Sequence, residues 1–557
     1  MNHSVIRLGS TAAQLVSNTS LQYLASQPQH SSGLLSMQSN QSVLSEQGNL
    51  LLVLGMPLPA ITTVPTSWQQ ACAELPQHEG VFAAIYWDSS AEKLVICTDI
   101  LGLQPLYWKK NADHIVLSDK TTAFTGEANH AGWGAFIALG YPLGRDTLTQ
   151  GVNRLDPAAL LVIDGKNLNV EQRCYWSFDQ QAPEADTESL FSALQASVDL
   201  TLAACSQQEH AILLSGGYDS RLIAFLLSER KLSLQATIVS HYDENLDADA
   251  RFAKAIACHL AIPYCLKRPQ QDFFSSPDYL EYLMASDAEI PSLYLFISQV
   301  GQFIDAPVVW EGLLPGKTLK ASEPDFATFQ RAHIKGFEHA IWRSAELVFG
   351  HEQARAMWQA FLARWHEEQA CYPDTGKGTA LFNLAHRARN RVGINPFKVY
   401  QQKAQVCMPG MSRDYLQAAM SIDHAKKQHH QLYQQIFRRY YPEALQFPIA
   451  HGSTVDRMQA SSLSSYLFQF ALSCHNRLNQ HPRMLRWLGI KPAQGFSPSR
   501  FLAPEQLLQN AGTGLNPAFL AKLAQGESLP EPALRLLFYW QSWQMLRQKP
   551  VQQWVQS

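Results

Sequence analysis

The chain has 557 residues, more than one hydrophobic core usually serves, so its length predicts two or three domains. Hydrophobic residues make up 46% and charged residues 16%, which is typical of a globular protein and argues against disorder. The net charge of -3 provides no broad basic field, so neither a nucleic acid nor a membrane is expected as a partner.

The nine cysteines are scattered and form no C-x-x-C pair, which argues against a zinc knuckle or a thioredoxin-like site. An odd number of unclustered cysteines suits reduced thiols. The N-terminal residues show no basic region followed by an apolar core, and no run of about 18 apolar residues occurs. We therefore predict a cytoplasmic protein without a membrane span.

Residues 1–180 read as many short strands separated by turn residues. The clearest are 51–55, 80–88, 93–99, 114–119 and 159–164. Near residue 180 the composition changes to a polar, proline-containing linker followed by a helical pattern. We expect a β-rich N-terminal domain that ends at about residue 180.

From residue 210 to about 320, strands alternate with helices, which is the βαβαβ pattern of a parallel sheet. After about residue 330 the chain is mostly helical, and residues 533–548 form a closing helix. Residues 181–557 are therefore predicted as a second, α/β domain with a large helical extension.

The segment "HAILLSGGYDSRLIAFLLSERK" (210–231) places two glycines, two serines and an acid at a strand-to-helix corner. Backbone N–H groups at a helix N-terminus favour an anion, and glycines remove side chains that would block a phosphate. The hydroxyls of Ser215 and Ser220 can donate to phosphate oxygens, while Asp219 makes sense if Mg²⁺ bridges it to the phosphate. An ordinary structural corner is the alternative.

The loop matches S-G-G-x-D-S, the pyrophosphate-binding loop of ATP pyrophosphatases, with Ser215, Gly216, Gly217, Asp219 and Ser220. Two further segments, "GVFAAIYWDSSAEKLVICTDILGLQPLYW" and "LSLQATIVSHYDENLDADARFAKAIACHLAIPY", resemble the asparagine synthetase B family, which includes β-lactam synthetases and lasso-peptide cyclases. The resemblance covers residues 80–320 well and continues weakly to about 455. It implies an α/β (α+β overall) fold, with an αββα Ntn-hydrolase-like domain before a parallel-sheet ATP-binding domain, and it places Val239 near the adenine.

The N-terminus departs from the family pattern, in which glutamine-using members carry a cysteine as the first mature residue. Here the chain begins Met1-Asn2-His3, and its first cysteine is Cys72, well inside the sequence. We therefore expect the glutaminase-like domain to be an inert scaffold.

A second departure is the segment "APVVWEGLLPGKTLK" (306–320), which stands where the family has a glycine-rich acidic loop. Gly312 matches the first glycine of that loop, but the metal-side aspartate is missing. Glu311 is the candidate replacement, and a solvated acid at a strand end is an equal alternative. Lys317 and Lys320 either neutralise pyrophosphate or are ordinary surface lysines.

The helical region departs as well, because the resemblance implies a catalytic lysine and none follows residues 440–454. His451 is the nearest titratable group, although a single histidine is more often structural. Arg387, Arg389 and Arg391 recur at every second residue, either along an anionic substrate path or on a solvated helix face.

The resemblance implies an amide-forming ligase that uses ATP and Mg²⁺, with Asp219, Glu311 and His451 as catalytic candidates and Asp219 as the metal ligand. A carboxylate and an amine, each on a small molecule or a peptide, are the expected substrates. An ammonia-using asparagine synthetase and a nucleotide-binding pseudoenzyme are the alternatives. Whether the chain pairs with itself or with another biosynthetic protein stays open.

Overall fold

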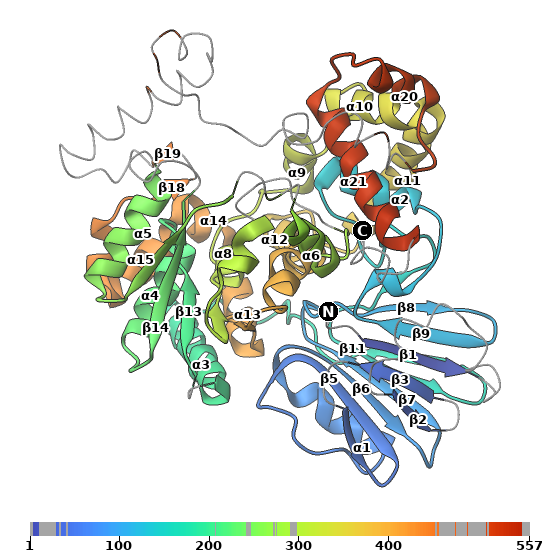
Figure 1. Ribbon diagram of the computed structural model, residues 1–557. Coiled ribbons are helices and arrows are strands. Elements are labelled where there is room, and N and C mark those ends of the chain that lie inside the picture. Colours follow the sequence, from blue (N-terminus) through green and yellow to red (C-terminus); the bar gives the residue numbers. More distant parts are fainter. Residues whose placement is uncertain are drawn as a thin grey trace.

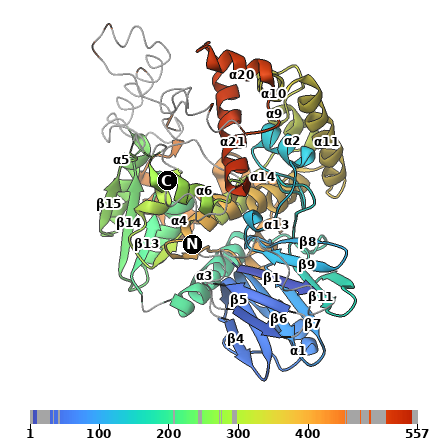
Figure 2. The ribbon, with the colours of Figure 1, turned by 45° about the vertical axis from the view of Figure 1, so that its right-hand side comes forward.

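The fold was analysed in a computed structural model, shown in Figures 1 and 2. The structure describes residues 4–9, 29–32, 35–39, 43–205, 208–240, 247–270, 273, 276–289, 298–451, 454–455, 474, 487, 489, 508 and 512–548.

The N-terminal part contains two antiparallel sheets of six strands each. The first sheet has the order β10-β8-β9-β1-β3-β2, with β10 Asn153–Arg154, β8 Tyr107–Lys110, β9 His114–Ser118, β1 Ser4–Gly9, β3 Leu35–Ser39 and β2 Gln29–Ser32. The second has the order β12-β11-β7-β6-β5-β4, with β12 Val170–Cys174, β11 Ala159–Asp164, β7 Lys93–Thr98, β6 Glu79–Asp88, β5 Asn49–Leu58 and β4 Val43–Glu46. Alternating apolar residues of both sheets interdigitate between them, among them Ile6, Leu52, Ile85 and Leu117. Helix α1 (Trp68–Glu74) and the short helix η3 (Leu75–Gln77) lie on the second sheet's outer face.

The second sheet-forming region has five parallel strands in the order β15-β14-β13-β16-β17. Their bounds are β15 Tyr264–Lys267, β14 Leu234–Val239, β13 His210–Leu213, β16 Val308–Trp310 and β17 Gln405–Cys407. Helices surround this sheet, as the left side of Figure 1 shows, and they include α3 Thr187–Cys205, α4 Tyr218–Ser228, α5 Ala248–His259, α8 Leu313–Thr318, α13 Arg413–Ser421 and α15 Gln431–Tyr440. One apolar core joins these helices to the sheet.

A helical region fills the upper right of Figure 1. It is built from α9 Phe326–His333, α10 Ala340–Phe349, α11 His351–Gln369, α20 Pro517–Ala524 and α21 Glu531–Gln548. Helix α6 (Pro277–Ala285) packs against it. Helix α12 (Gly376–Phe382) and the π-helix η7 (Asn383–Lys398), with a kink at Asn395, connect it to the parallel sheet. The remaining short elements are η4 Thr121–Ala123, η6 Val300–Phe303, α14 His424–Lys427, η8 Gln428–His430, η9 Pro442–Gln446, β18 Ala450–His451 and β19 Thr454–Val455.

Helix α2 (His130–Leu139) comes from the N-terminal part of the sequence but belongs spatially to the helical region. Its Trp133 ring lies 4.8 Å from the Trp540 ring and 5.6 Å from the Trp543 ring, both on α21. Gly134 permits the close approach of α11, since a Cβ there would lie 2.2 Å from the Met357 carbonyl oxygen. Helices α2 and α21, far apart in the sequence, are therefore packed together, as the cyan and red helices of Figure 2 show.

The predicted fold class is confirmed: an antiparallel double sheet precedes a parallel-sheet domain with a helical extension. The predicted strands 80–88, 93–99 and 159–164 correspond to β6, β7 and β11. The division at residue 180 falls between β12 and α3. The position of α2 shows that this boundary in the sequence is not a clean boundary in space, and the division stays a prediction.

Candidate functional site

The predicted strand-to-helix corner lies in the middle of the parallel sheet. Strand β13 pairs with β14 on one side and β16 on the other, so the corner follows the carboxyl end of a central strand. In open parallel sheets ligands bind at this edge. Helix α4 begins at Tyr218 with Gly217 as its N-cap residue, and no side chain caps it there. The first N–H groups of the helix are therefore not covered by a cap side chain.

Ser215 and Ser220 lie together across the loop, as the motif predicts. Their hydroxyl oxygens are 2.9 Å apart, and the Ser215 N–H donates to the Ser220 hydroxyl over 3.0 Å. The Gly217 N–H donates to the Ser215 hydroxyl over 3.3 Å. Hydroxyls and backbone N–H groups thus form one polar patch of the size that a phosphate group needs.

Asp249, at the start of α5, is a member of this site that sequence reasoning missed. Its Oδ1 accepts the Gly216 N–H over 2.9 Å, and burial raises the pKa of this carboxyl to about 7. The residue lies 33 positions from the loop. The only sign of this residue in the sequence is the acidic start of the helix that follows β14.

Arg221 was also missed, although it directly follows the motif. Its side chain is fully buried and donates to four backbone carbonyls, which belong to Gly216, Ala444, Phe447 and Pro448, over 2.8–2.9 Å. This guanidinium ties the loop to the segment after α15, so its role is to hold the loop in shape.

The Asp219 carboxylate has a protein donor on each oxygen. Lys320 Nζ lies 2.8 Å from Oδ2, and the Tyr433 hydroxyl donates to Oδ1 over 2.8 Å. Both side chains of the ion pair keep about a third of their surface exposed, 30% for Asp219 and 33% for Lys320. Asp219 therefore orients a cation that solvent and ligands can reach.

Two glycines allow the 311–320 segment to approach the corner so closely. A Cβ on Gly312 would lie 2.8–2.9 Å from backbone atoms of Asp219 and Ser220, and one on Gly316 would lie 2.4 Å from Asp219 Oδ2. The segment forms the short helix α8, which packs on α4 with its lysines at the corner. The segment "EGLLPGKTLK" is thus a packing element of the site.

Burial and neighbouring charges shift the pKa values of Glu311 and Lys317. Burial, and then the charge of Asp219, raises the pKa of Glu311 to about 8, so its carboxyl is largely protonated at pH 7. Burial, together with the charges of Arg387, Lys320 and Arg391, lowers the pKa of Lys317 to about 8 against the opposite effect of Asp219. Two of the three arginines predicted at every second residue, Arg387 and Arg391, thus act on this site.

The third of these arginines, Arg389, contacts the N-terminal part of the chain. It is buried and donates to the Gly144 carbonyl over 2.8 Å and to the Leu155 carbonyl, which belong to the N-terminal part. It therefore joins the π-helix to the double sheet.

Magnesium does not fit the predicted position at Asp219. Mg²⁺ requires near-octahedral oxygen ligands, and both oxygens of this carboxylate are engaged by Lys320 and Tyr433. Burial and the charge of Asp219 raise the pKa of the neighbouring acid, Glu311. Within the described residues, no group of three or more His, Cys, Asp or Glu side chains is arranged to hold a metal ion.

The last two predicted residues, Val239 and His451, lie in strands β14 and β18. Val239 ends β14, next to the corner strand, at the edge where the resemblance places the adenine. His451 lies in β18, paired with Thr454, and its side chain is outside the described part of the structure. Its predicted catalytic role stays a prediction.

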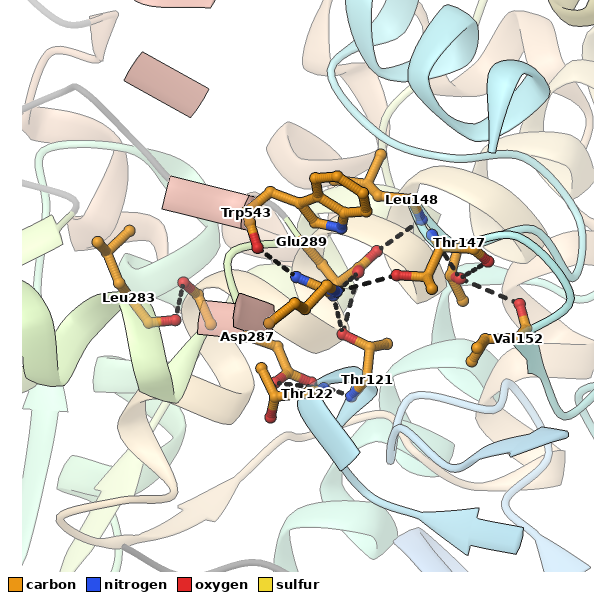
Figure 3. A network of polar contacts seen from close by, with 12 residues as sticks. Thr121, Thr122, Thr147, Leu148, Val152, Leu283, Asp287, Glu289 and Trp543 are labelled. Carbon is orange, nitrogen blue, oxygen red and sulfur yellow. Dashed lines mark hydrogen bonds and ion pairs between the residues drawn. The ribbon is translucent and has the colours of Figure 1, made fainter. Parts of the chain in front are cut away.

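A second charged cluster lies where three parts of the chain meet (Figure 3). Glu289 accepts from Arg547 of α21 over 2.8 Å, from the Leu148 N–H over 3.1 Å and from the Thr121 hydroxyl over 3.0 Å. Asp287 accepts from the Thr121 N–H and from the Thr122 hydroxyl, the latter over 2.9 Å.

Two lysines complete this cluster, which we call the buried ion network. Lys398 of η7 lies 3.4 Å from Asp287 and donates to the Asp119 carbonyl, and Lys120 donates to the Met284 carbonyl over 3.0 Å. The acids and cations of the network are almost completely buried: Asp287, Glu289, Lys120, Lys398 and Arg547.

Two family models match the chain. A glutamine amidotransferase domain model matches residues 62–176, and an asparagine synthase model matches residues 190–303. The second match contains the corner, Asp249 and strand β14. In the described part of the chain no helix is both long and apolar enough to cross a membrane.

Among curated proteins, amidase chyE of Penicillium rubens is 23% identical over 350 residues, which are 57% of this chain and 51% of that protein. Amidase chry2 of Gibberella zeae is 24% identical over 159 residues, 27% of this chain and 23% of that protein. The chain thus spans about half or less of these relatives. Among solved structures, glutamine phosphoribosylpyrophosphate amidotransferase from B. subtilis is 12% identical, with a TM-score of 0.20, over 47% of this chain and 65% of that chain.

Proposed function

We propose that this chain, in which a glutamine amidotransferase model matches before an asparagine synthase model, is an ATP-dependent amide-forming ligase and a divergent member of the asparagine synthetase family. In this proposal ATP activates a substrate carboxylate as an acyl-adenylate, and an amine then takes the acyl group. The substrates are a carboxylate and an amine on a small molecule or a peptide.

The observation that carries this proposal is the corner of residues 215–220 with Lys317 of α8 and the following Lys320 beside it. The loop gives a phosphate backbone N–H groups, two hydroxyls and the N-terminus of α4. Lys317 and Lys320 add positive charge at the same edge of the sheet. This combination supports binding of the nucleotide through its phosphates, with the adenine toward Val239.

The proposed reaction has two steps. A carboxylate oxygen attacks the α-phosphorus, the bond from that phosphorus to the bridging oxygen breaks, and pyrophosphate leaves with the bond electrons. The amine nitrogen then attacks the acyl carbon, the bond from the acyl carbon to the AMP oxygen breaks, and the amine loses a proton. The residues of the corner contribute by positioning the phosphates and by neutralising the charge on the departing pyrophosphate.

The test is exchange of labelled pyrophosphate into ATP, measured with pooled candidate carboxylates. Carboxylate-dependent exchange supports the proposal, and its absence with every pool contradicts it. Gly217→Val should abolish exchange without unfolding the protein, because its Cβ has ordinary contacts (3.4 Å to the Ser215 hydroxyl) but the branched side chain would stand at the phosphate patch. Gly336→Val is the matched control, since a Cβ there meets nothing within 4 Å.

The same assay separates the two alternatives. Exchange that depends on aspartate alone would favour an asparagine synthetase that uses ammonia. Nucleotide binding without exchange for any carboxylate would favour the pseudoenzyme.

We also propose that the amine is supplied directly and not released from glutamine. Strand β1 begins with Ser4, whose N–H donates to Asp119 over 2.7 Å. Of the described cysteines in this part, Cys174 ends the edge strand β12, whereas Cys72 and Cys97 lie on the outer face of the second sheet, where burial raises the pKa of both thiols. We expect no glutamate release from glutamine above a buffer blank, and measurable release would contradict this part of the proposal.

A further inference from the structure

The cations at the corner come from two elements that lie far apart in the sequence. Lys317 belongs to α8 and Lys320 follows it, while Arg387 and Arg391 belong to η7, which packs against α8. We call these four residues the corner cations. We propose that the corner cations replace the divalent metal in neutralising the phosphates, so that this protein binds a nucleoside triphosphate without Mg²⁺. This inference rests on the proposed nucleotide site.

The first argument is the state of Asp219, the residue expected to hold the metal. Lys320 and Tyr433 donate to its two oxygens, each over 2.8 Å. Tyr433 is fully buried and stacks on Tyr218, with ring centroids 5.5 Å apart, so its hydroxyl is fixed in place. A metal ion at Asp219 would have to displace donors that the fold itself positions.

The second argument is that the close packing of α8 on α4 fixes the position of Lys320. Helix α8 approaches α4 closely enough only because Gly312 and Gly316 have no side chains. The Thr318 hydroxyl, between the two lysines, contacts the buried Tyr415 hydroxyl over 2.7 Å and fixes the end of α8. An ammonium group is therefore held at the place where the expected mechanism needs a cation.

The third argument is the balance of charge. Lys320 contacts Asp219 and keeps 33% of its side chain exposed, and Lys317, whose pKa the charges of Asp219, Arg387 and Arg391 influence, lies nearby. An anion with several charges complements such a group of cations. A triphosphate that extends from the loop toward α8 is the ligand class that fits.

The experiment measures binding of α,β-methylene-ATP by calorimetry, once with excess EDTA and once with excess Mg²⁺. This nucleotide cannot be cleaved between its α- and β-phosphates, so turnover does not interfere. We expect affinities within about threefold of each other under the two conditions, since a tenfold change needs about 1.4 kcal/mol of differential binding. Binding that requires Mg²⁺ would overturn the inference and leave the proposed function intact. No binding under either condition would overturn the proposed function itself.

Three variants sharpen the result, with folding checked by thermal melting. Lys320→Ala should weaken binding in EDTA by about tenfold or more, because a charge-assisted contact is lost. Asp219→Asn should bind in EDTA at least as tightly as the parent, because the ammonium then loses its internal counter-charge. A metal ligand at Asp219 predicts the opposite, a large loss in Mg²⁺, and that result would overturn the inference.

The third variant, Lys320→Asp, places an acid where the ammonium was and should make binding dependent on Mg²⁺. Lys335→Ala is the matched control, because this exposed lysine donates only to carbonyls of its own helix end in the described structure, Arg331 and Ala332. The control should bind like the parent under both conditions. An equal loss in Lys335→Ala and Lys320→Ala would overturn the inference, since it would show an unspecific effect of net charge.

Discussion

The corner of residues 215–220 and the buried ion network both gather charges from distant parts of the chain, but the two clusters differ in burial. In the network, Asp287 and Glu289 are at most 1% exposed, and both accept hydrogen bonds from the threonines of η4 (Figure 3). At the corner, Asp219 and Lys320 are about a third exposed, and further cations stand nearby. The charges of the network are paired with groups of the protein itself, whereas the charged side chains of the corner stay partly exposed and can be reached by a ligand.

The largest effect is expected from removing one acid of the buried ion network. Glu289→Ala leaves the Arg547 guanidinium buried without its carboxylate, and it also removes the acceptor of the Leu148 N–H. Breaking a buried pair from one side costs about 3–5 kcal/mol of unfolding free energy. Urea unfolding followed by tryptophan fluorescence measures it. A variant as stable as the parent would show that the network is not what joins α21 to the rest of the molecule.

The next effect concerns nucleotide affinity and not stability. Arg387→Ala removes one of the corner cations, and the side chain is only partly buried, so the fold should survive. We expect nucleotide binding to weaken by about three- to tenfold, less than for a direct contact. Arg389→Ala is the comparison from the same helix. It should lower the melting temperature, because this guanidinium holds carbonyls of the N-terminal part. The reverse pattern would contradict the division of roles.

The pH dependence of stability distinguishes Asp249 of the corner from Asp287 of the buried ion network. Asp249 has a folded-state pKa raised to about 7, so between about pH 4 and 7 the folded state binds more protons than the unfolded one. Stability from this group is therefore lost as the pH rises through that range. Asp249→Asn can still accept the Gly216 N–H and should gain melting temperature relative to the parent from pH 5 to pH 7.5. Asp287, whose pKa is lowered by Lys398 and Lys120 against its burial, contributes with the opposite sign.

The smallest effect is expected from removing an exposed ion pair that belongs to neither cluster. Lys166 forms an ion pair with Glu92 over 3.2 Å, and 73% of its side chain is exposed. Exposed pairs contribute about 1 kcal/mol or less, because water and salt screen them. Lys166→Ala should therefore leave urea unfolding and nucleotide binding almost unchanged. A loss as large as that of Glu289→Ala would mean that burial does not explain the strength of the network.

The sequence by itself determined the local parts of this protein. The apolar run before Ser215 predicted β13, the two glycines predicted the loop, and the helical pattern after them predicted α4. These predictions were possible because hydrophobic periodicity and turn residues depend on only a few neighbouring positions. The alternation of strands and helices predicted the parallel sheet for the same reason.

The tertiary structure alone decided which side chains meet. Lys320 and Tyr433 lie 101 and 214 positions from Asp219, and no periodicity in the sequence encodes such a distance. The same holds for α2, which packs against α21 at the other end of the chain. The sequence could predict a cation at the loop, but whether magnesium or an ammonium group faces Asp219 depends on how closely α8 packs on α4. Gly312 and Gly316 set that distance, and their effect is visible only when both helices are in place.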